Sequence, residues 1–390
     1  MQKIKVYHFH NGSGGGVFSV IKNLLKFSIN RDIENHLIYT INKESNSKFK
    51  VPQLEGAASQ QLFYYSPKWN FYYTCKQLAK LLPDDKAVIV AHDWLELGMA
   101  SNLGLQNPLV HFIHGDYEYY YNLAEKHEQS TDKFIAVSPV IQQKLCLAIP
   151  LRKKDIFFCR FPVPSLQTIK KEIEVLKILY CVRNLNDENK QFKILPLINV
   201  KLLSKGIRVR WTIIGDGMKK EEVENLIDQH SGVSLFPSLS NEEVIKQLPA
   251  HDLFILPSLR EGFPVAVVEA MKAGVVPLVT NWEGATEKLI IEGESGYYFK
   301  TGDVDGYANT IALLHADRKL LNQLAENGVK KANELFNPFV NTKNIEAVIS
   351  NAYSGKKQKE SFKVYGSRLD KEWLPNVITN LIRTFGKKYS

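Results

Sequence analysis

The sequence has little of what stabilises small secreted proteins or anchors proteins in membranes. Its 390 residues include only four cysteines, which lie far apart and form no Cys-x-x-Cys pair. This spacing argues against a zinc site or a disulfide scaffold and fits a reducing compartment. No window of about 18 apolar residues is present, so we expect no transmembrane helix. The first residues also lack the apolar core and small-residue cleavage site of a signal peptide, and we expect a cytoplasmic protein.

Positive charge is in small excess along most of the chain and is concentrated near its end. The formal net charge is +9, of which residues 351–390 carry +6, from nine Lys/Arg and three Asp/Glu. A nucleic-acid-binding protein usually places a basic stripe on its folded body, so we do not expect nucleic acid as a partner. A basic tail can instead be attracted to an anionic membrane surface, or it can be a solvated tail.

Short apolar, β-branched runs alternate with amphipathic stretches, which predicts an α/β fold with parallel sheets covered by helices. The expected strands are Ile4–Phe9, His36–Ile41, Ala87–Ala91, Leu109–Ile113, Lys133–Val137 and Asp155–Cys159 in the first half, and Leu176–Val182, Arg208–Gly215, Val233–Phe236, Asp252–Leu256, Val276–Thr280 and Tyr297–Phe299 in the second. The expected helices include Val17–Ile29, Phe71–Leu82, Pro139–Leu147, Phe192–Leu203, Lys219–Gln229, Pro264–Ala273, Pro338–Ala352 and Trp373–Phe385.

The length of the chain predicts two domains, because a single hydrophobic core rarely exceeds about 250–300 residues. Two prolines within residues 161–164 cannot continue a helix or a central strand, and they mark the linker. We therefore expect an N-terminal Rossmann-like domain at 1–164 and a C-terminal Rossmann-like domain at 165–337. Helices and the basic tail follow at 338–390.

Open parallel sheets bind ligands at the carboxyl ends of their strands, so the candidates in the first half are residues that follow strands. A glycine-rich loop follows the first strand, where Gly15 and Gly16 allow a phosphate or sugar to approach the backbone. It is not a dinucleotide fingerprint, because the third glycine position holds Val17. Imidazoles and carboxylates that can bind sugar hydroxyls follow two later strands. These residues are His92, Asp93, His114 and Asp116, with Tyr117 beside them.

The second half carries two cations where a sheet would bind a diphosphate. Arg183 ends the first expected strand of this half, and Lys190 opens the helix that follows. An arginine offers a planar fork of donors to phosphate, and a lysine offers a mobile point charge. A later strand ends in a glycine-rich turn that begins at Gly215.

The segment from residue 258 to residue 270 contains the most specific pattern. Pro264 is expected as a first helical residue, since it needs no donor and its φ is already helical. Gly262 and Phe263 would then present N–H groups at a helix N-terminus, which favours anions. Glu261 lies just outside that terminus. Glu269 lies inside the helix among apolar residues, where a carboxylate needs a hydrogen-bond partner such as a ribose diol.

Together these motifs resemble the retaining glycosyltransferases of the GT-B fold, specifically glycosyltransferase family 4. The residues before the arginine and after the lysine, usually glycine in that family, are Val182 and Gln191 here. The matching landmarks are the Gly14–Gly16 loop, His114-Gly115, Val137-Ser138, Arg183, Lys190, Gly215-Asp216-Gly217 and the Glu-x7-Glu motif from Glu261 to Glu269.

The resemblance implies two Rossmann-like domains facing each other across a cleft, with C-terminal helices returning to the N-terminal domain. It also implies transfer of a sugar, with retention of configuration, from a nucleoside-diphosphate sugar to a glycan or lipid-linked acceptor. Such reactions build cell-surface polysaccharides or glycolipids, and no metal or other cofactor is implied. The alternatives are an epimerase, a phosphorylase, or a non-catalytic nucleotide-sugar-binding or scaffold protein of the same fold.

Residue roles follow from the same resemblance. Arg183, Lys190 and the N–H groups near Phe263 would stabilise the leaving diphosphate. Glu261 and His114 would act at the donor sugar, and Glu269 would hold the ribose. The other donor-binding residues implied are Gly15, Gly16, Gly215, Leu239, Gly262, Pro264 and Val265, while His92, Asp93, Asp116 and Tyr117 fall on the acceptor side.

The last expected helix, Trp373–Phe385, has apolar residues at i, i+1, i+4 and i+5, which form one stripe. Lysines and arginines flank the stripe, as in helices that lie in a membrane interface. One interpretation is therefore a peripheral protein whose C-terminal tail and this helix dock on the inner face of a membrane. The fold implied by the resemblance favours the other interpretation, in which the helix packs on the N-terminal domain and buries its stripe. Both interpretations can hold if the helix packs on the protein while the segment Lys356–Lys363 faces lipid.

Overall fold

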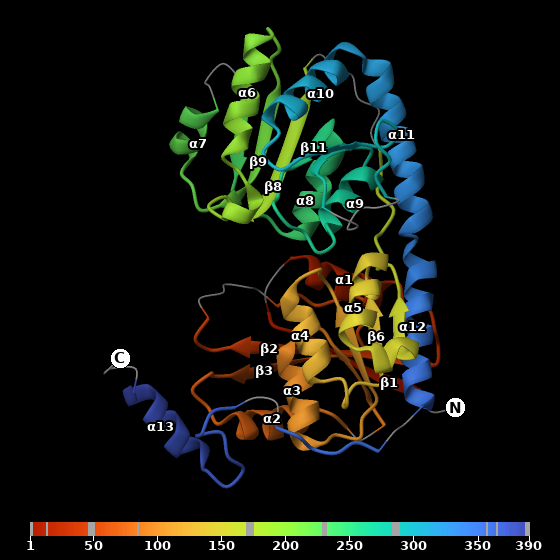
Figure 1. Cartoon of the computed structure of the whole chain (residues 1–390), viewed down its shortest axis with the longest axis vertical. Coiled ribbons are helices and arrows are strands. Elements are labelled where there is room, and N and C mark those ends of the chain that lie inside the picture. The colour runs from red at the N-terminus through yellow and green to blue at the C-terminus, as the bar shows by residue number, and fades with distance from the viewer. Residues whose placement is uncertain are drawn as a thin grey trace. The chain divides into compact units, whose positions relative to one another are not determined.

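The computed structural model describes residues 3–12, 15–45, 51–83, 86–168, 175–227, 232–282, 289–355, 358–363 and 366–386. The chain forms two compact units (Figure 1). Unit 1 contains Met1–Pro162 together with Pro338–Ser390, and unit 2 contains Val163–Asn337. Within the described ranges, no helix combines the length and the apolar composition needed to cross a membrane.

The described residues of unit 1 form a seven-stranded parallel sheet with the order β3-β2-β1-β4-β5-β6-β7. Its central strands are buried along their length, as expected for a parallel sheet covered by helices on both faces. The strands are β1 (Ile4–His10), β2 (Ile33–Asn42), β3 (Ser59–Tyr65), β4 (Val88–Ala91), β5 (Leu109–Ile113), β6 (Lys133–Ala136) and β7 (Ile156–Phe158). The helices between them are α1 (Gly16–Lys26), α2 (Phe71–Ala79), α3 (Trp94–Leu103), α4 (Glu118–Lys126), α5 (Pro139–Ala148) and the 3-10 helix η1 (Pro150–Asp155).

Strand β3 is missing from the sequence prediction. It pairs only with β2, at the edge of the sheet, so most of its residues stay partly or fully exposed. An edge strand needs no continuous apolar run, and the polar start Ser59-Gln60-Gln61 gives no strand signal.

The described part of unit 2 forms a six-stranded parallel sheet with the order β10-β9-β8-β11-β12-β13. Its strands are β8 (Lys177–Asn184), β9 (Arg210–Asp216), β10 (Val233–Phe236), β11 (Leu253–Leu256), β12 (Val276–Thr280) and β13 (Tyr297–Phe299). Its helices are η2 (Glu188–Lys190), α6 (Ile194–Ser204), α7 (Lys220–Leu226), α8 (Asn241–Gln247), η3 (Leu248–Ala250), α9 (Val265–Lys272), α10 (Val304–Ala316) and α11 (Arg318–Leu335).

Both sheets have the Rossmann-like strand order, which confirms the predicted α/β class. In each sheet the order of strand addition reverses beside the first strand, between β1 and β4 in unit 1 and between β8 and β11 in unit 2. Ligands of open parallel sheets bind outside the carboxyl ends of the strands at such a switch point. The loops after these four strands are therefore where a site is expected.

One buried lysine holds together the two ends of unit 2. Lys272, at the end of α9, is fully buried and donates from Nζ to the carbonyl oxygens of Val163 (2.6 Å) and Phe336 (2.9 Å). The Val163 N–H also donates to the Phe336 carbonyl at 3.4 Å. Burial lowers the pKa of Lys272 to about 8. The two carbonyls replace the water that a buried ammonium loses.

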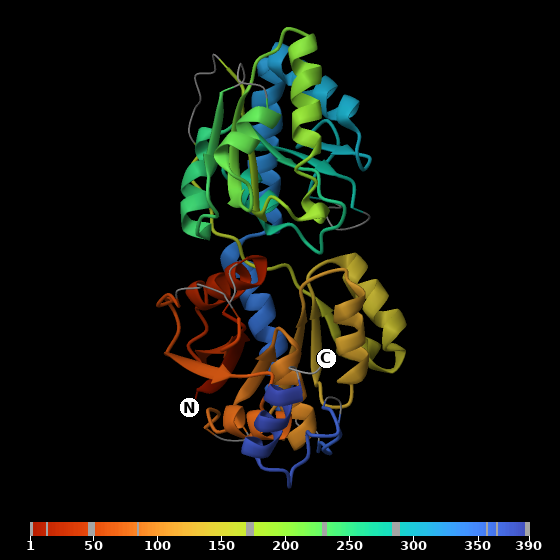
Figure 2. The ribbon, with the colours of Figure 1, turned by 90° about the vertical axis from the view of Figure 1, so that its left-hand side faces the viewer.

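The end of the chain returns to unit 1, as predicted. Helix α12 (Pro338–Ser354) lies against β4, β5, β6 and α1. Beyond it, Lys359 Nζ pairs with Asp132 Oδ2 at 2.6 Å, and both side chains are 5% exposed. Helix α13 (Asn376–Gly386) follows and lies beside the start of α2 (Figure 2). It starts three residues later than the sequence predicts.

The Lys359–Asp132 pair should stabilise unit 1 measurably. Removing one partner of a buried ion pair costs about 3–5 kcal/mol, because the other charge stays buried without compensation. We expect Lys359→Met to lower the free energy of unfolding by about 3 kcal/mol in denaturant titrations. The control is Lys343→Met, at an exposed position on α12, which should stay within about 0.5 kcal/mol of wild type. Equal stability of the two variants would contradict the role of the pair.

Candidate functional site

In unit 2, the two predicted cations lie at the end of β8 and in the loop that follows it, at the switch point. Arg183 is the penultimate residue of β8 and is exposed, with no ion pair to any other described residue. Lys190 ends η2, and its Nζ lies 2.6 Å from Oε1 of Glu261. Their side chains are 25% and 12% exposed, so this pair is partly withdrawn from water. The structure thus joins two residues that the sequence separates by 71 positions.

Asn189 fixes the position of this loop, and sequence reasoning did not single it out. Its carbonyl accepts from the Leu259 N–H at 2.8 Å, and its side-chain oxygen accepts from the Arg260 N–H at 3.0 Å. Its side-chain amide donates to the Arg260 carbonyl at 3.0 Å. Three hydrogen bonds therefore fasten the loop after β8 to the loop after β11 and hold Lys190 beside Glu261.

Gln191 stands where the related family usually has glycine, and its backbone explains that preference. Its φ is +52°, the only positive φ of a non-glycine residue in the described ranges. This left-handed conformation costs a residue with a Cβ roughly 1–2 kcal/mol. The turn after Lys190 thus adopts a left-handed conformation although its residue has a Cβ.

The pattern around Pro264 folds nearly as predicted. Helix α9 begins at Val265, so Pro264 is the residue before the helix and not its first residue. Glu269 is 3% exposed, which confirms the expectation of a buried carboxylate. Its Oε1 accepts from the side-chain amide of Asn241, the first residue of α8, at 2.9 Å. Asn241 is a second residue that sequence reasoning missed, because its contact is made only in the fold.

The turn at the end of β9 requires glycine at its first position for steric reasons. A Cβ on Gly215 would lie 2.8 Å from the Val182 carbonyl oxygen, so only glycine lets β9 and β8 approach this closely. The next residue, Asp216, accepts from the Ser238 N–H at 3.0 Å and thereby holds the loop that carries the half-buried Leu239.

In the loop before α9, Gly262 is buried and Phe263 packs against Phe336, with ring centroids 5.4 Å apart.

In unit 1, the predicted glycine-rich loop leads into α1. Gly15 precedes the helix with φ +114°, a conformation that favours glycine, and Gly16 is the first helical residue. A Cβ on Gly15 would meet nothing within 4 Å, so its requirement is conformational and not steric. Gly14 lies outside the described residues.

His92 and His114 are linked to each other and to a third histidine. His92 Nδ1 lies 2.7 Å from His114 Nε2, and His92 Nε2 lies 3.3 Å from Nδ1 of His8 on β1. His8 Nε2 lies 3.3 Å from the side-chain oxygen of Asn35 on β2. The amide of Asn35 donates to Ser28 Oγ at 3.0 Å, and Ser28 donates to Glu346 of α12 at 2.5 Å. We call these six residues, from Glu346 to His114, the histidine relay.

All three rings of the relay are neutral at physiological pH. Burial lowers the pKa of His8 to about 4 and that of His114 to about 3. Burial, followed by the nearby His114, holds the pKa of His92 well below its usual value. His114 is partly exposed, but its ring packs on Phe112 at 4.6 Å.

Because the rings are neutral, each hydrogen bond of the relay has a defined donor and a defined acceptor. The Asn35 amide nitrogen faces Ser28, so its oxygen must accept from His8 Nε2–H. A neutral imidazole has one N–H, so His8 Nδ1 accepts from His92, and His92 Nδ1 accepts in turn from His114 Nε2–H. His114 Nδ1 is left as an acceptor, and no other described residue bonds to it. The relay therefore leaves one acceptor lone pair at its end, on His114 Nδ1.

Glu96 holds the backbone that follows β4, at the same edge of the sheet. It is 1% exposed, and its Oε1 accepts from the N–H groups of His92 and Asp93, both at 2.7 Å. Burial, and then the charge of Asp93, raises the pKa of Glu96 to about 8. The polar positions after β4 are thus held by a carboxyl group that sequence reasoning missed.

The remaining acceptor-side candidates form two small clusters. Asp93 accepts from the Trp94 N–H at the start of α3, from the Asn11 amide at 3.3 Å and from the Tyr119 hydroxyl. Asp116 pairs with Lys144 at 2.6 Å and accepts from the Tyr121 hydroxyl at 2.7 Å. Tyr117 is 37% exposed. Asp116 is therefore already neutralised within unit 1.

No group of three or more His, Cys, Asp or Glu able to hold a metal occurs among the residues described. Asp303 and Asp305 form an Asp-x-Asp pattern, but both carboxylates make contacts that stabilise the fold. Asp303 accepts from the Gly306 N–H at 2.8 Å as the cap of α10, and Asp305 pairs with Lys201 at 2.9 Å.

Comparisons with known proteins agree with this geometry. Residues 167–331 match the family model of glycosyl transferases group 1. An N-acetylgalactosaminyltransferase of Campylobacter jejuni, named as acting on N,N'-diacetylbacillosaminyl-diphospho-undecaprenol, is 36% identical over 93 residues, 24% of each chain. The capsular polysaccharide biosynthesis glycosyltransferase CapM of Staphylococcus aureus is 28% identical over 154 residues, 38% of this chain and 39% of CapM. These alignments cover less than two thirds of the relatives' own length.

Solved structures share the fold over most of the chain. HepE of Anabaena, in complex with UDP and glucose, has a TM-score of 0.71 and 16% identity, covering 89% of this chain and all of HepE. Sucrose-phosphate synthase of Thermosynechococcus elongatus has a TM-score of 0.70 and 14% identity, covering 90% of this chain and all of that one. The predicted GT-B fold and the resemblance to group 1 glycosyltransferases are confirmed. Membership of family 4 stays a prediction.

The histidine relay makes a prediction for its proton positions. We expect long-range ¹H–¹⁵N spectra to show His8, His92 and His114 as neutral Nε2–H tautomers at pH 7 and still at pH 5.5. Asn35→Leu removes the side-chain oxygen that accepts from His8 Nε2–H, so Nδ1–H tautomers of the three histidines should become populated. Asn35→Asp keeps an oxygen facing His8 and should preserve the wild-type tautomers. Unchanged tautomers in Asn35→Leu would show that Asn35 does not direct the relay.

Proposed function

We propose that the protein is a retaining glycosyltransferase that moves a sugar from a nucleoside-diphosphate sugar to a glycan or lipid-linked acceptor. The observation that carries the proposal is the arrangement after β8 and β11, where Arg183 and the Lys190–Glu261 pair occupy the switch point of unit 2. The match of residues 167–331 to group 1 glycosyltransferases supports it.

The cations supply what the departure of a diphosphate requires. As the bond between the anomeric carbon and the diphosphate breaks, negative charge builds on the phosphate oxygens. Arg183 and Lys190, with the N–H groups near Phe263, stabilise that charge in the transition state. These two cations supply the charge that a metal ion provides in other transferases, so we propose that the reaction needs none.

The Lys190–Glu261 pair also accounts for how Lys190 is held before the donor binds. The carboxylate of Glu261 neutralises the ammonium while the diphosphate is absent. On binding, the diphosphate replaces the carboxylate as partner of Lys190, and Glu261 becomes free to accept from a hydroxyl of the donor sugar. Glu269, already buried, exchanges part of its interaction with Asn241 for the ribose diol.

Unit 1 contributes the acceptor side of the reaction. The hydroxyl of the acceptor attacks the anomeric carbon on the face that the diphosphate leaves, which retains the configuration. Its proton passes to a departing phosphate oxygen, and no covalent enzyme intermediate forms. His114 accepts from a hydroxyl of the donor sugar through Nδ1, which the histidine relay keeps unprotonated.

The names of relatives support the acceptor class. The Campylobacter jejuni relative is named for an undecaprenol-diphosphate acceptor, and so is a galactosyltransferase of Escherichia coli that is 34% identical over 91 residues. CapM is named for capsular polysaccharide synthesis. We therefore propose a lipid-linked or glycan acceptor in polysaccharide or glycolipid synthesis. Turnover of any donor would distinguish this function from that of a non-catalytic nucleotide-sugar-binding protein.

The two glutamates should affect different steps. Glu269→Ala should weaken nucleoside-diphosphate binding, measured by calorimetry, because the ribose diol loses its buried acceptor. Glu261→Ala should lower kcat with little change in nucleotide affinity, because it acts on the sugar. Glu326→Ala, an exposed glutamate on α11, is the control and should match wild type. Wild-type values in both glutamate variants would refute the assignment.

The two cations should act on the transition state. Removing either should cost about 2–4 kcal/mol in transition-state stabilisation, seen as a drop in kcat/KM for Arg183→Ala and Lys190→Ala. Lys319→Ala, at an exposed position on α11, should leave kcat/KM unchanged. Losses below tenfold in both cation variants would contradict their role. EDTA should leave activity intact, and its abolition by chelation would overturn the metal-free proposal.

A further inference from the structure

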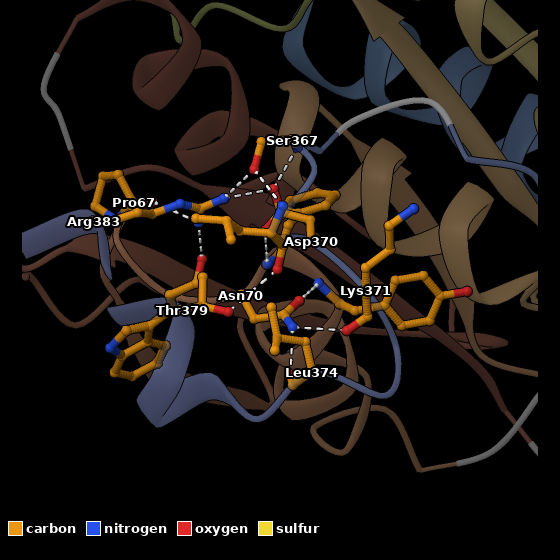
Figure 3. Close-up of polar contacts among 12 residues, drawn as sticks. Pro67, Asn70, Ser367, Asp370, Lys371, Leu374, Thr379 and Arg383 are labelled. Carbon is orange, nitrogen blue, oxygen red and sulfur yellow. Dashed lines mark hydrogen bonds and ion pairs between the residues drawn. The ribbon is translucent and has the colours of Figure 1, made fainter. Parts of the chain in front are cut away.

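Helix α13 is attached to unit 1 by its polar side. Thr379 is buried and donates to the Leu369 carbonyl at 3.2 Å, while Asn376 accepts from the Asn70 N–H at 2.8 Å. One turn later, Arg383 donates to Ser367 Oγ at 2.8 Å and to the carbonyls of Pro67 and Trp69 (Figure 3). These three positions recur every three to four residues, so they form one face of the helix.

The Asp370 carboxylate organises this attachment. It is 4% exposed and accepts from the Phe71 N–H at 2.6 Å and from Arg383 at 2.7 Å. Burial alone would raise the pKa of Asp370, but the hydrogen bonds from Phe71, Arg383 and Ser367 outweigh it and lower the pKa. Asn70 adds two bonds from its amide to the Lys371 and Leu374 carbonyls, at 2.8 and 2.7 Å. The charged and polar contacts therefore fix which way α13 faces.

The apolar side of the same helix faces solvent. The expectation that packing on the N-terminal domain would bury the apolar stripe is therefore wrong, because the polar face makes that contact instead. Within the helix the exposed fractions are Val377 68%, Ile378 44%, Leu381 52%, Ile382 47% and Phe385 56%, and Trp373, three residues before the helix, is 77% exposed. We call these six residues the α13 stripe.

Positively charged residues flank the α13 stripe on both sides in the sequence. Arg368 and Lys371 precede the helix and are exposed, and Lys387 and Lys388 follow it in the sequence. The nearby acids are already paired, Asp370 with Arg383 and Glu372 with Lys76 at 2.8 Å. Residues 366–390 carry five Lys/Arg and two Asp/Glu, a net charge of +3.

The expectation that Lys356–Lys363 faces lipid is wrong for Lys359, while Lys363 is exposed and donates to the carbonyls of Ser367 and Asp370. Lys359 is buried in its pair with Asp132, and Lys356 and Lys357 lie outside the described residues.

We propose that the α13 stripe binds the surface of an anionic lipid bilayer, with the helix lying in the plane of the interface. Apolar side chains on one face and cations at the ends are the features of such helices. A second copy of this chain would bring two positively charged segments together, whereas anionic headgroups complement them. This surface goes beyond the proposed transfer reaction and does not depend on it.

The test is binding of the full-length protein to vesicles. We expect co-sedimentation with phosphatidylglycerol-containing vesicles and at least tenfold weaker binding to phosphatidylcholine vesicles at about 0.1 M salt, where the Debye length is about 10 Å. The double variant Leu381→Glu/Phe385→Glu should bind anionic vesicles at least tenfold more weakly. The control is Leu151→Glu on η1, at a position 87% exposed and outside the α13 stripe, and it should bind as wild type does.

A second readout reports on the stripe itself. Tryptophan emission should shift to shorter wavelength on adding anionic vesicles, and the shift should disappear in Trp373→Phe. Equal binding to both vesicle types, or wild-type binding by Leu381→Glu/Phe385→Glu, would overturn the proposal. A dimer in solution that this double variant dissociates, without any vesicle binding, would also overturn it and assign the stripe to a second copy. Transferase activity in solution is measured separately, so its absence leaves this test unaffected.

Discussion

Each sheet consists of strands that run in one direction, so the carboxyl ends of all its strands lie along one edge. That constraint decides where polar residues can gather without interrupting the core. In unit 2 the edge carries Arg183 and the Lys190–Glu261 pair, and in unit 1 it carries His92 and His114. The interior can then remain apolar. His8 on β1 enters it as a polar group, and the relay satisfies the hydrogen bonds of its ring.

Much of the fold follows from sequence because it depends on local patterns. Apolar runs locate the buried strands of both sheets, and β3 is missed because an edge strand needs no such run. Local patterns also locate site residues that lie in one loop, such as Glu261 and the turn before α9. Asn189, Asn35 and Glu346 could not be found in this way. Each acts on a residue far away in the chain, and a histidine or asparagine within a strand does not differ in pattern from any other polar residue.

The orientation of α13 illustrates a different limit. Periodicity shows that a helix has an apolar and a polar face, but the face that meets the protein depends on what the neighbouring surface offers. Here the surface offers Asp370 and Asn70, two residues in irregular segments, and they bind the polar face through Arg383 and Asn376. A buried carboxylate that needs a cation has therefore decided the orientation against the usual preference for burying apolar side chains.

Lys272 has a consequence for how the protein could have evolved. Unit 2 is inserted between two parts of unit 1, since the chain enters it at Val163 and leaves it at Asn337. Because one ammonium binds both Val163 and Phe336, the two ends of this inserted domain lie side by side. Domains with adjacent termini tolerate transfer between hosts, since neither host nor insert must open its own sheet. Recombination at two neighbouring points of the backbone could thus exchange the whole of unit 2 as a module.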